Sequence, residues 1–185
     1  LAFMLLTACA QDAPEIIKIQ GQAQGTTFHI NYWSATPVDH QAVAQAIQEA
    51  FNSIDVNLSN YRPDSVIEQF NSQLTTQSQS VVPEIIELVR IGQIVNEKSQ
   101  GCFDLTIKPV FDLWGFTGEN LNIPSPEQLA EQLAKVGMNK IQIVDDTHLS
   151  KLQEGVRIDV SAVAQGYSVG RISQVLEQMG VSNYL

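Results

Sequence analysis

Residues that could bind a flat, polar, phosphorylated ligand occur at several turns of this chain. Residues 25–27 (Gly-Thr-Thr) offer close backbone approach and two hydroxyl groups. Tyr61 offers an aromatic face near Ser65, which stands where a helix is predicted to begin. Phe103, Asp104 and Trp114 combine aromatic area with a carboxylate. These residue types favour binding of an aromatic ring system that also carries phosphate.

The stretch RIDVSAVAQGY, residues 157–167, suggests where the phosphates and a cation would lie. An apolar run interrupted by Asp159 predicts a strand over 156–160, followed by a turn of small residues and a helix from Gly166 to Met179. Unpaired N–H groups and the dipole at a helix start favour an anion. Carbonyl oxygens at the strand end could bind a hard cation. A diphosphate with a divalent metal would suit this turn.

Each of these features also has a purely structural interpretation. Aromatic side chains in a domain of this size most often belong to the core. The stretch GQAQGTT resembles a phosphate-binding loop in its glycines but has no Lys before its Thr. None of the three histidines lies at metal-ligand spacing to another His or Cys. Cys102 is predicted to be a small buried apolar residue rather than a nucleophile.

The composition predicts a soluble globular domain. The chain has 185 residues, 44% of them hydrophobic, with a formal net charge of −10 and an isoelectric point near 4.6. Non-specific nucleic-acid binding needs a basic face, so this charge argues against a nucleic-acid partner.

The elements that must position these residues are mixed strands and helices. Strand-like runs cover 16–19 and 26–33, and a long helix from Asp39 carries one apolar face. A short helix capped by Asp64 or Ser65 follows the turn at 62–64, and another helix runs from Pro83 to Gly101.

The second half of the chain continues this alternation. Pro109 and Gly115 predict an irregular segment over 101–116. A capping box at 125–128 starts a helix that Gly137 would end, and a hairpin over 140–153 follows. Residues 181–185 predict a further strand. Together these elements indicate an α+β or α/β fold without an internal domain boundary.

The first residues predict export from the cytoplasm. Residues 1–9 read as a clipped signal peptide that ends in a lipobox, Leu-Thr-Ala-Cys, with Cys9 as the lipidated residue. The alternative is an ordinary signal peptide with an incidental Cys. Residues 10–14 read as a tether. Two or more acyl chains on Cys9 would anchor the protein stably to a membrane.

Four stretches, taken in order, resemble one known family. QGTTFHI, IDVNLSNYRPDSVIEQFN, GCFDLTIKPVFDLWGF and IDVSAVAQGYSVGRI are similar to the successive motifs of the FAD:protein FMN transferase family, the ApbE-type flavin transferases. The resemblance runs from about Gly21 to Leu185. It implies the α+β fold of that family, related to the T-fold, with mixed sheets and packed helices. Residues 15–185 would form the N-terminal part of a single domain.

The resemblance also implies an activity and a location. Such proteins use Mg²⁺ to split FAD and attach FMN through a phosphoester to a Thr or Ser of target proteins, including subunits of electron-transport and sodium-pumping complexes. They are lipid-anchored on the periplasmic side of the bacterial envelope, more often at the inner membrane. The alternatives are an FAD-binding lipoprotein and an FAD pyrophosphatase, neither with transferase activity.

The matching positions imply a set of site residues. The resemblance assigns the carbonyl of Ala162 to Mg²⁺ and twelve residues to FAD: Gly25, Thr26, Tyr61, Ser65, Asn71, Phe103, Asp104, Trp114, Asp159, Gln165, Gly166 and Tyr167. Tyr61, Ser65 and Asn71 would line a pocket wall, and Asp159 would orient the turn before the helix.

The chain departs from the family pattern at two of these places and at its end. Gln24 stands where Met is common, and Gln165 stands where Lys is common, which removes a positive charge beside the diphosphate. The metal-binding Asp and Thr of the family and a His-containing motif are expected beyond Leu185. A polypeptide of these residues alone is therefore expected to be a truncated, inactive piece.

Overall fold

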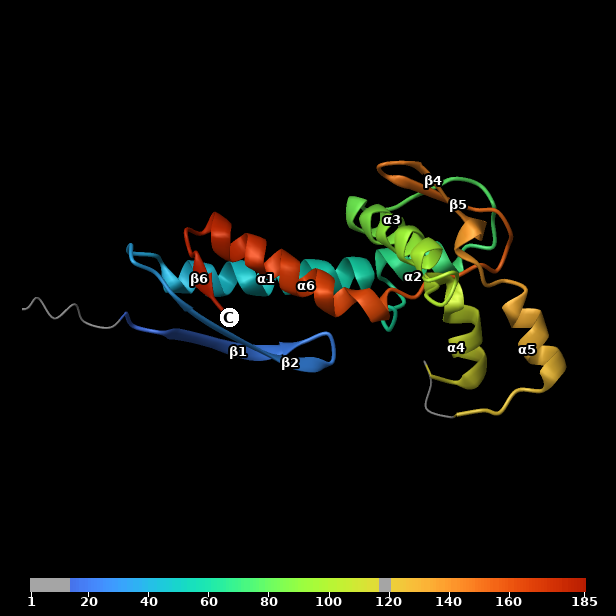
Figure 1. Cartoon of the computed structure of the whole chain (residues 1–185), viewed down its shortest axis with the longest axis horizontal. Coiled ribbons are helices and arrows are strands. Elements are labelled where there is room, and N and C mark those ends of the chain that lie inside the picture. The colour runs from blue at the N-terminus through green and yellow to red at the C-terminus, as the bar shows by residue number, and fades with distance from the viewer. Residues whose placement is uncertain (1–13, 117–120) are drawn as a thin grey trace, which may run out of the picture.

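The computed structural model describes residues 14–116 and 121–185, and its helices and strands alternate along the chain (Figure 1). Between them lie two short 3₁₀ turns, at Leu105–Ile107 and Met138–Lys140. The elements in chain order are β1 (Ile17–Ala23), β2 (Thr26–Trp33), α1 (His40–Leu58), α2 (Val66–Ser72), β3 (Gln79–Ser80), α3 (Pro83–Lys98), α4 (Lys108–Trp114), α5 (Pro126–Leu133), β4 (Ile141–Asp145), β5 (His148–Lys151), α6 (Ser161–Gln178) and β6 (Asn183–Tyr184).

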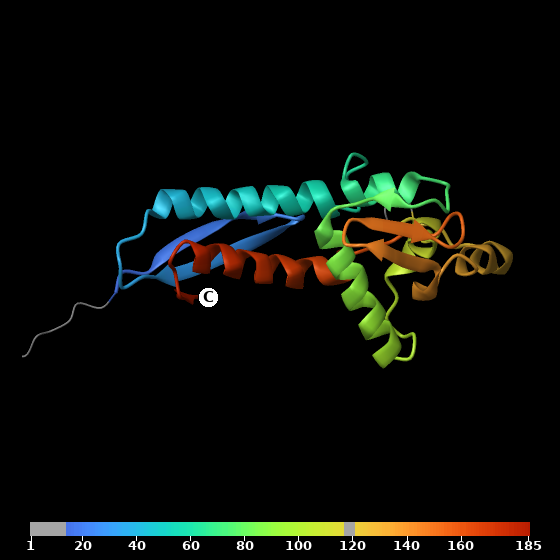
Figure 2. The same ribbon diagram turned by 90° about the horizontal axis from the view of Figure 1, so that it is seen from above.

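The first body of the molecule packs two long helices on a small sheet. The hairpin of β1 and β2 is antiparallel, and β6 adds to the other edge of β2. Helices α1 and α6 run side by side along this sheet (Figure 2). The core between these layers consists of Ile30, Tyr32, Val43, Ile47, Phe51, Ile172, Val175, Leu176 and Val181.

The second body packs α2 and α3 against a sheet of order β3-β5-β4. Its core includes Ile67, Phe70, Ile85, Leu149 and Ile158, all of them at most 2% exposed.

Helix α1 belongs to both bodies. The predicted apolar face is confirmed, because Val43, Ile47, Phe51, Ile54 and Leu58 are all buried. The first three residues pack in the first core, and the last two pack in the second. The side chain of Asp39 caps the helix by accepting hydrogen bonds from two backbone N–H groups. One continuous helix therefore fixes how the two bodies lie relative to each other.

The prediction of an irregular segment over 101–116 is wrong, because α4 forms within it. Pro109 lies in the first turn of α4, where a missing N–H group costs no helical hydrogen bond. Gly115 ends the helix with a φ of 81°, the left-handed conformation that glycine adopts without strain. Both residues mark the ends of a short helix rather than excluding one.

The predictions of a strand over 156–160 and of a turn after it are also wrong. Residues 156–160 form no regular strand and pair with no strand of the described chain. Helix α6 already begins at Ser161, so the small residues before Gly166 form its first turn. The predicted end of the preceding helix at Gly137 is wrong as well, since α5 ends at Leu133 and Gly137 precedes a 3₁₀ turn.

Other expectations are confirmed. The capping box at Ser125 and Gln128 is present, the hairpin of β4 and β5 forms, and β6 lies within the predicted 181–185. Cys102 is exposed, which contradicts its predicted burial. The predicted lipobox with Cys9 lies outside the described residues. Within the described ranges, no helix combines the length and hydrophobicity that crossing a bilayer requires.

Candidate functional site

A cavity of about 610 Å³ lies where the tip of the β1–β2 hairpin, the end of α1 and the start of α6 meet. We call it the α6 cavity. Its volume is in the range that holds small-molecule ligands. Its lining residues are Gln24, Gly25, Ile54, Asp55, Leu58, Ser59, Asn60, Tyr61, Arg62, Ser161, Ala164 and Gln165.

Tyr61 gives the α6 cavity an aromatic wall. Its side chain is 74% exposed, while the neighbouring Asn60 and Leu58 are buried. The exposed ring is a surface on which a flat ring system can stack. Tyr61 lies in the turn after α1, which ends at Leu58.

Arg62 is the one cation among the residues that line the α6 cavity. Its guanidinium group forms ion pairs at 2.7 Å with Asp55 and with Asp64. Hydrogen bonds to Asp64 and then to Asp55 raise the pKa of Arg62 further above its usual value. The same arginine lowers the pKa of the Asp64 carboxyl through a hydrogen bond. Arg62 therefore stays charged and is held in a fixed orientation.

The hairpin tip forms the opposite wall of the cavity. Gln24 and Gly25 form the turn, with φ angles of 53° and 74°. The stretch is a tight β-turn between paired strands rather than a phosphate loop, which agrees with the missing Lys before its Thr. The side-chain amide of Gln24 donates a hydrogen bond of 2.5 Å to Ser168 Oγ on α6. This bond joins the hairpin tip to the helix.

The start of α6 is held by side chains instead of a neighbouring strand. Asn71 donates to the carbonyl of Ile158 at 2.8 Å and accepts from its N–H at 2.7 Å. Asn60 also donates to the Ile158 carbonyl and accepts from Val160 N–H. Asp159 accepts from the backbone N–H of Ser161, the first residue of α6. These contacts fix residues 158–161, and with them the cavity wall that α6 provides.

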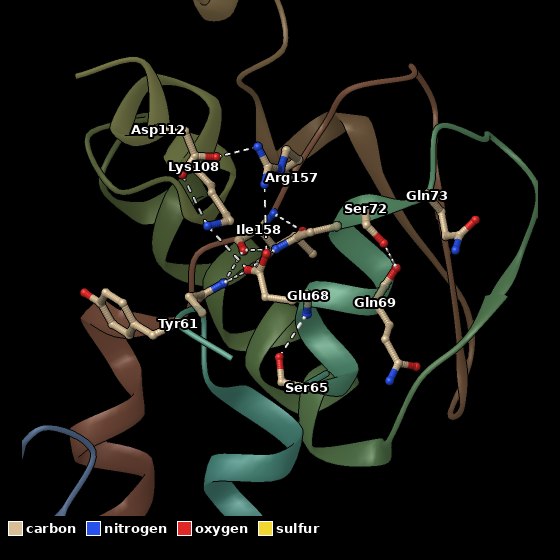
Figure 3. A network of polar contacts seen from close by, with 12 residues as sticks. Tyr61, Ser65, Glu68, Gln69, Ser72, Gln73, Lys108, Asp112, Arg157 and Ile158 are labelled. Carbon is tan, nitrogen blue, oxygen red and sulfur yellow. Dashed lines mark hydrogen bonds and ion pairs between the residues drawn. The ribbon is translucent and has the colours of Figure 1, made fainter. Parts of the chain in front are cut away.

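A partly buried network of charged groups lies next to these hydrogen bonds (Figure 3). Lys108 Nζ lies 3.4 Å from a carboxylate oxygen of Glu68 and 3.4 Å from one of Asp112. Arg157 pairs with Asp112 at 2.5 Å and lies 3.9 Å from Glu68. Glu68 also accepts from Asn71. Two cations thus face two carboxylates, and this balance makes the burial of the Lys108 ammonium group tolerable.

Lys151 supports the same region from β5. It is fully buried and donates to the backbone carbonyls of Asn71 and Gln73. Its ammonium group lies 4.7 Å from the centre of the Phe70 ring. Burial, with a smaller contribution from Arg157, lowers the pKa of Lys151 to about 8. Lys151 thereby fixes the end of α2, which carries Asn71.

The structure brings three of the predicted FAD residues into the α6 cavity: Gly25, Tyr61 and Gln165. Thr26 lies just outside it, in a neighbouring cavity. Gly166 is exposed within α6, and Tyr167 is half-buried on the same helix. The sequence predicted that the helix starts at Gly166. This prediction is wrong, because α6 begins five residues earlier, at Ser161.

Other predicted site residues serve as structural contacts. Ser65 and Asn71, which the resemblance assigned to a pocket wall, are at most 1% exposed and are not among the residues that line the α6 cavity. Ser65 caps α2 by accepting from Glu68 N–H and donates to the carbonyl of Ser59. Asp159 is 7% exposed and orients the backbone before α6, as expected.

The segment of Phe103, Asp104 and Trp114 lies apart from the residues that line the α6 cavity. Asp104 accepts hydrogen bonds from the backbone N–H groups of Thr106 and Met138. Phe103 packs against the second core, and Trp114 is half-buried at the end of α4. Asp104 therefore ties the start of α4 to the chain after α5.

The described residues do not form a magnesium site by themselves. Among them there is no group of three or more His, Cys, Asp or Glu residues placed to hold a metal ion. Ala162 lies in the first turn of α6, where a helical carbonyl faces the N–H group four residues on, at Gly166. We derive no reaction step through a metal from this geometry.

Sequence reasoning missed several residues of the site. Asn60, Asp55 and Arg62 were read only as parts of a helix end and a turn. The sequence signal that could have found Asn60 and Arg62 is their position on either side of Tyr61, whereas Asp55 lies six residues earlier. Ser168 gave no signal, because its partner Gln24 lies 144 residues away along the chain.

Comparison with known proteins supports the predicted resemblance. The model of the ApbE family matches residues 24–185. A protein of Haemophilus influenzae named FAD:protein FMN transferase is 31% identical over 199 aligned residues, covering 100% of this chain and 56% of the relative. A Vibrio cholerae protein of the same name is 28% identical, also with 100% and 56% coverage. The chain thus spans about half the length of the curated relatives it matches.

Solved structures agree with the fold. The flavin transferase ApbE from Vibrio cholerae superposes with a TM-score of 0.87 at 26% identity, over 93% of this chain and 56% of that one. The apo form of the flavinyl transferase ApbE from Pseudomonas stutzeri gives a TM-score of 0.88 at 28% identity, with the same coverage. The predicted α+β fold is confirmed by these matches.

Proposed function

The chain belongs to the ApbE family. From this premise we propose that the full-length protein transfers FMN from FAD to a Ser or Thr hydroxyl group of a target protein. In this reaction the hydroxyl oxygen of the target bonds to the FMN phosphorus of FAD. The bond from that phosphorus to the bridging oxygen breaks, AMP leaves with that oxygen, and the hydroxyl proton passes to solvent.

The α6 cavity is the observation that carries the proposal. It combines an exposed tyrosine ring, a fixed cation and a helix start in a space of about 610 Å³. We assign the Tyr61 ring to stacking on a flat ring of FAD. We assign Arg62, the neutral amide of Gln165 and the start of α6 to the diphosphate. Phosphoryl transfer depends mainly on such positioning and charge neutralisation.

Gln165 makes this site less cationic than the family pattern implies. A neutral amide donates a hydrogen bond roughly half as strong as a charged donor does. Arg62 lies in the same cavity and is already paired with carboxylates. We propose that FAD binding here depends more on stacking and on hydrogen bonds than on net positive charge.

The proposal includes Mg²⁺ as cofactor, which would neutralise charge on the diphosphate. It also places the protein on the periplasmic side of the bacterial envelope, anchored through a lipid on Cys9. Its targets would be subunits of electron-transport or sodium-pumping complexes. These parts rest on the family resemblance and on the first residues of the sequence.

The test is to incubate the full-length protein with FAD, Mg²⁺ and a Thr-bearing target peptide, and to quantify AMP, free FMN and labelled peptide. The proposal predicts AMP and labelled peptide in equal amounts, and loss of both when EDTA removes the metal. AMP with free FMN and no labelled peptide would show an FAD pyrophosphatase instead. Bound but intact FAD would show a binding protein.

A further inference from the structure

A second cavity of about 610 Å³ lies on the other side of the hairpin tip, between the hairpin and α1. We call it the hairpin cavity. It is lined by residues 22–27 of the hairpin and by Gln48, Phe51, Asn52 and Asp55 of α1. It shares Gln24, Gly25 and Asp55 with the α6 cavity, so the two cavities meet along these residues.

We propose that the hairpin cavity is the acceptor subsite, which binds the polypeptide segment carrying the hydroxyl group that receives FMN. This inference rests on the proposed function, because a transferase needs a place for its second substrate. FAD in the α6 cavity leaves the hairpin cavity open to another ligand. A hydroxyl group that enters across the shared residues arrives beside the space assigned to the diphosphate.

The chemistry of the hairpin cavity fits a polypeptide better than a second anion. Its polar lining consists of amide side chains, such as Gln22, Gln48 and Asn52, and of the hydroxyl groups of Thr26 and Thr27. Amides donate and accept hydrogen bonds, as peptide groups do. No cation is among the lining residues, and the one charged group there is a carboxylate. A phosphate would therefore find no counter-charge there, whereas a neutral peptide segment needs none and can use the amide and hydroxyl groups.

The wall between the two cavities is held in place. Gln24 is bonded to Ser168 on α6, and Asp55 is paired with Arg62. The first contact joins the hairpin tip to α6, and the second joins α1 to the turn that follows it. A fixed boundary of this kind holds two substrates at a constant separation, and this supplies much of the rate advantage in a two-substrate reaction.

Gln48 and Asn52 are the residues to change. Both are exposed on α1, they bond to each other at 3.0 Å, and neither lines the α6 cavity. Gln45 and Glu49 provide a matched control, because they are exposed on the same helix and form the same kind of bond at 2.8 Å. The control pair lines neither cavity.

The experiment uses the full-length protein and a fluorescein-labelled Thr-bearing target peptide. Peptide binding is followed by anisotropy with FAD present and EDTA added, and transfer is followed separately with Mg²⁺. We expect the Gln48→Ala/Asn52→Ala variant to raise the peptide Kd and the peptide KM by about tenfold, which corresponds to about 1.4 kcal/mol. The Kd for FAD should stay within about twofold of wild type, and the Gln45→Ala/Glu49→Ala control should match wild type throughout.

Two results would overturn the inference. One is an unchanged peptide Kd in the Gln48→Ala/Asn52→Ala variant, with wild-type transfer intact, because the acceptor would then bind elsewhere. The other is an equal rise in the Kd for FAD, which would make the hairpin cavity part of the flavin site. If the wild-type protein labels no target at all, the proposed function itself fails, and that outcome is distinct from both.

Discussion

At the scale of single residues, two asparagines replace a neighbouring strand. Asn71 and Asn60 satisfy the backbone groups of Ile158 and Val160 through their side chains. A buried backbone group without a partner costs about 1–3 kcal/mol. These hydrogen bonds explain how residues 158–160, which lie outside any sheet, can stay buried and hold the start of α6.

Asn71→Ala should lower the free energy of unfolding by about 1–3 kcal/mol, because it leaves the buried N–H of Ile158 without its partner. It should also raise the Kd for FAD, since the start of α6 loses support. Chemical denaturation and FAD fluorescence titration measure the two effects. Exposed Asn122→Ala serves as control and should change neither quantity. Equal stability of the two variants would contradict the role assigned to Asn71.

Lys151 should make stability depend on pH in the alkaline range. Its pKa is about 8 in the folded protein and takes its ordinary value of 10.5 on unfolding. Between these values the unfolded state binds more protons, so stability should rise with pH, by at most about 1.4 kcal/mol per pH unit. Below pH 8 the contribution is constant.

The measurement for Lys151 compares denaturation of wild type and of Lys151→Met from pH 7 to 11. Wild type should gain stability relative to the variant above pH 8. An NMR titration of the Lys151 ammonium in wild type gives the midpoint directly, even if the variant folds poorly. Parallel stability curves together with a midpoint near 10.5 would refute this assignment.

At the scale of elements, the sequence predicted what local patterns determine. The apolar face of α1 and the capping box of α5 are local features, and both predictions are confirmed. Helix α4 was missed because Pro109 and Gly115 were taken as breakers, although each is compatible with a helix end. Segment 156–160 was taken for a strand because of its apolar run. Its side-chain partners, Asn71 and Asn60, lie 87 to 100 residues away, so no local pattern indicated them.

Two glycine substitutions should act with opposite signs. Gly115→Ala places a side chain at a φ of 81° and should destabilise the protein by about 1–2 kcal/mol. Gly170→Ala lies within α6 with open space around the added methyl group, and it should stabilise by about 0.5–1 kcal/mol. Thermal and urea denaturation test both. A stabilising Gly115→Ala would mean that α4 does not end as described.

At the scale of the whole molecule, two bodies share α1 (Figure 1). The α6 cavity is lined by residues from the end of α1, where the helix passes from the first core to the second. The family and fold could be predicted from four ordered motifs. The site was predicted only in part. Gly25, Tyr61 and Gln165 line the α6 cavity, whereas Asn71 holds the backbone before α6 and Asp104 holds a segment that does not line the cavity. The sequence motifs contain residues that line the cavity and residues that hold the backbone, and only the three-dimensional structure distinguishes the two.

The most direct measurement of the central claim is the intact mass of a Thr-bearing target after incubation with FAD, Mg²⁺ and full-length protein. Wild type should add one FMN in phosphoester linkage to each target molecule. At limiting FAD, Tyr61→Ala should slow the addition by about tenfold, because it removes the stacking surface of the α6 cavity. A target that gains no mass, or one labelled equally fast by the Tyr61→Ala variant, would contradict the account.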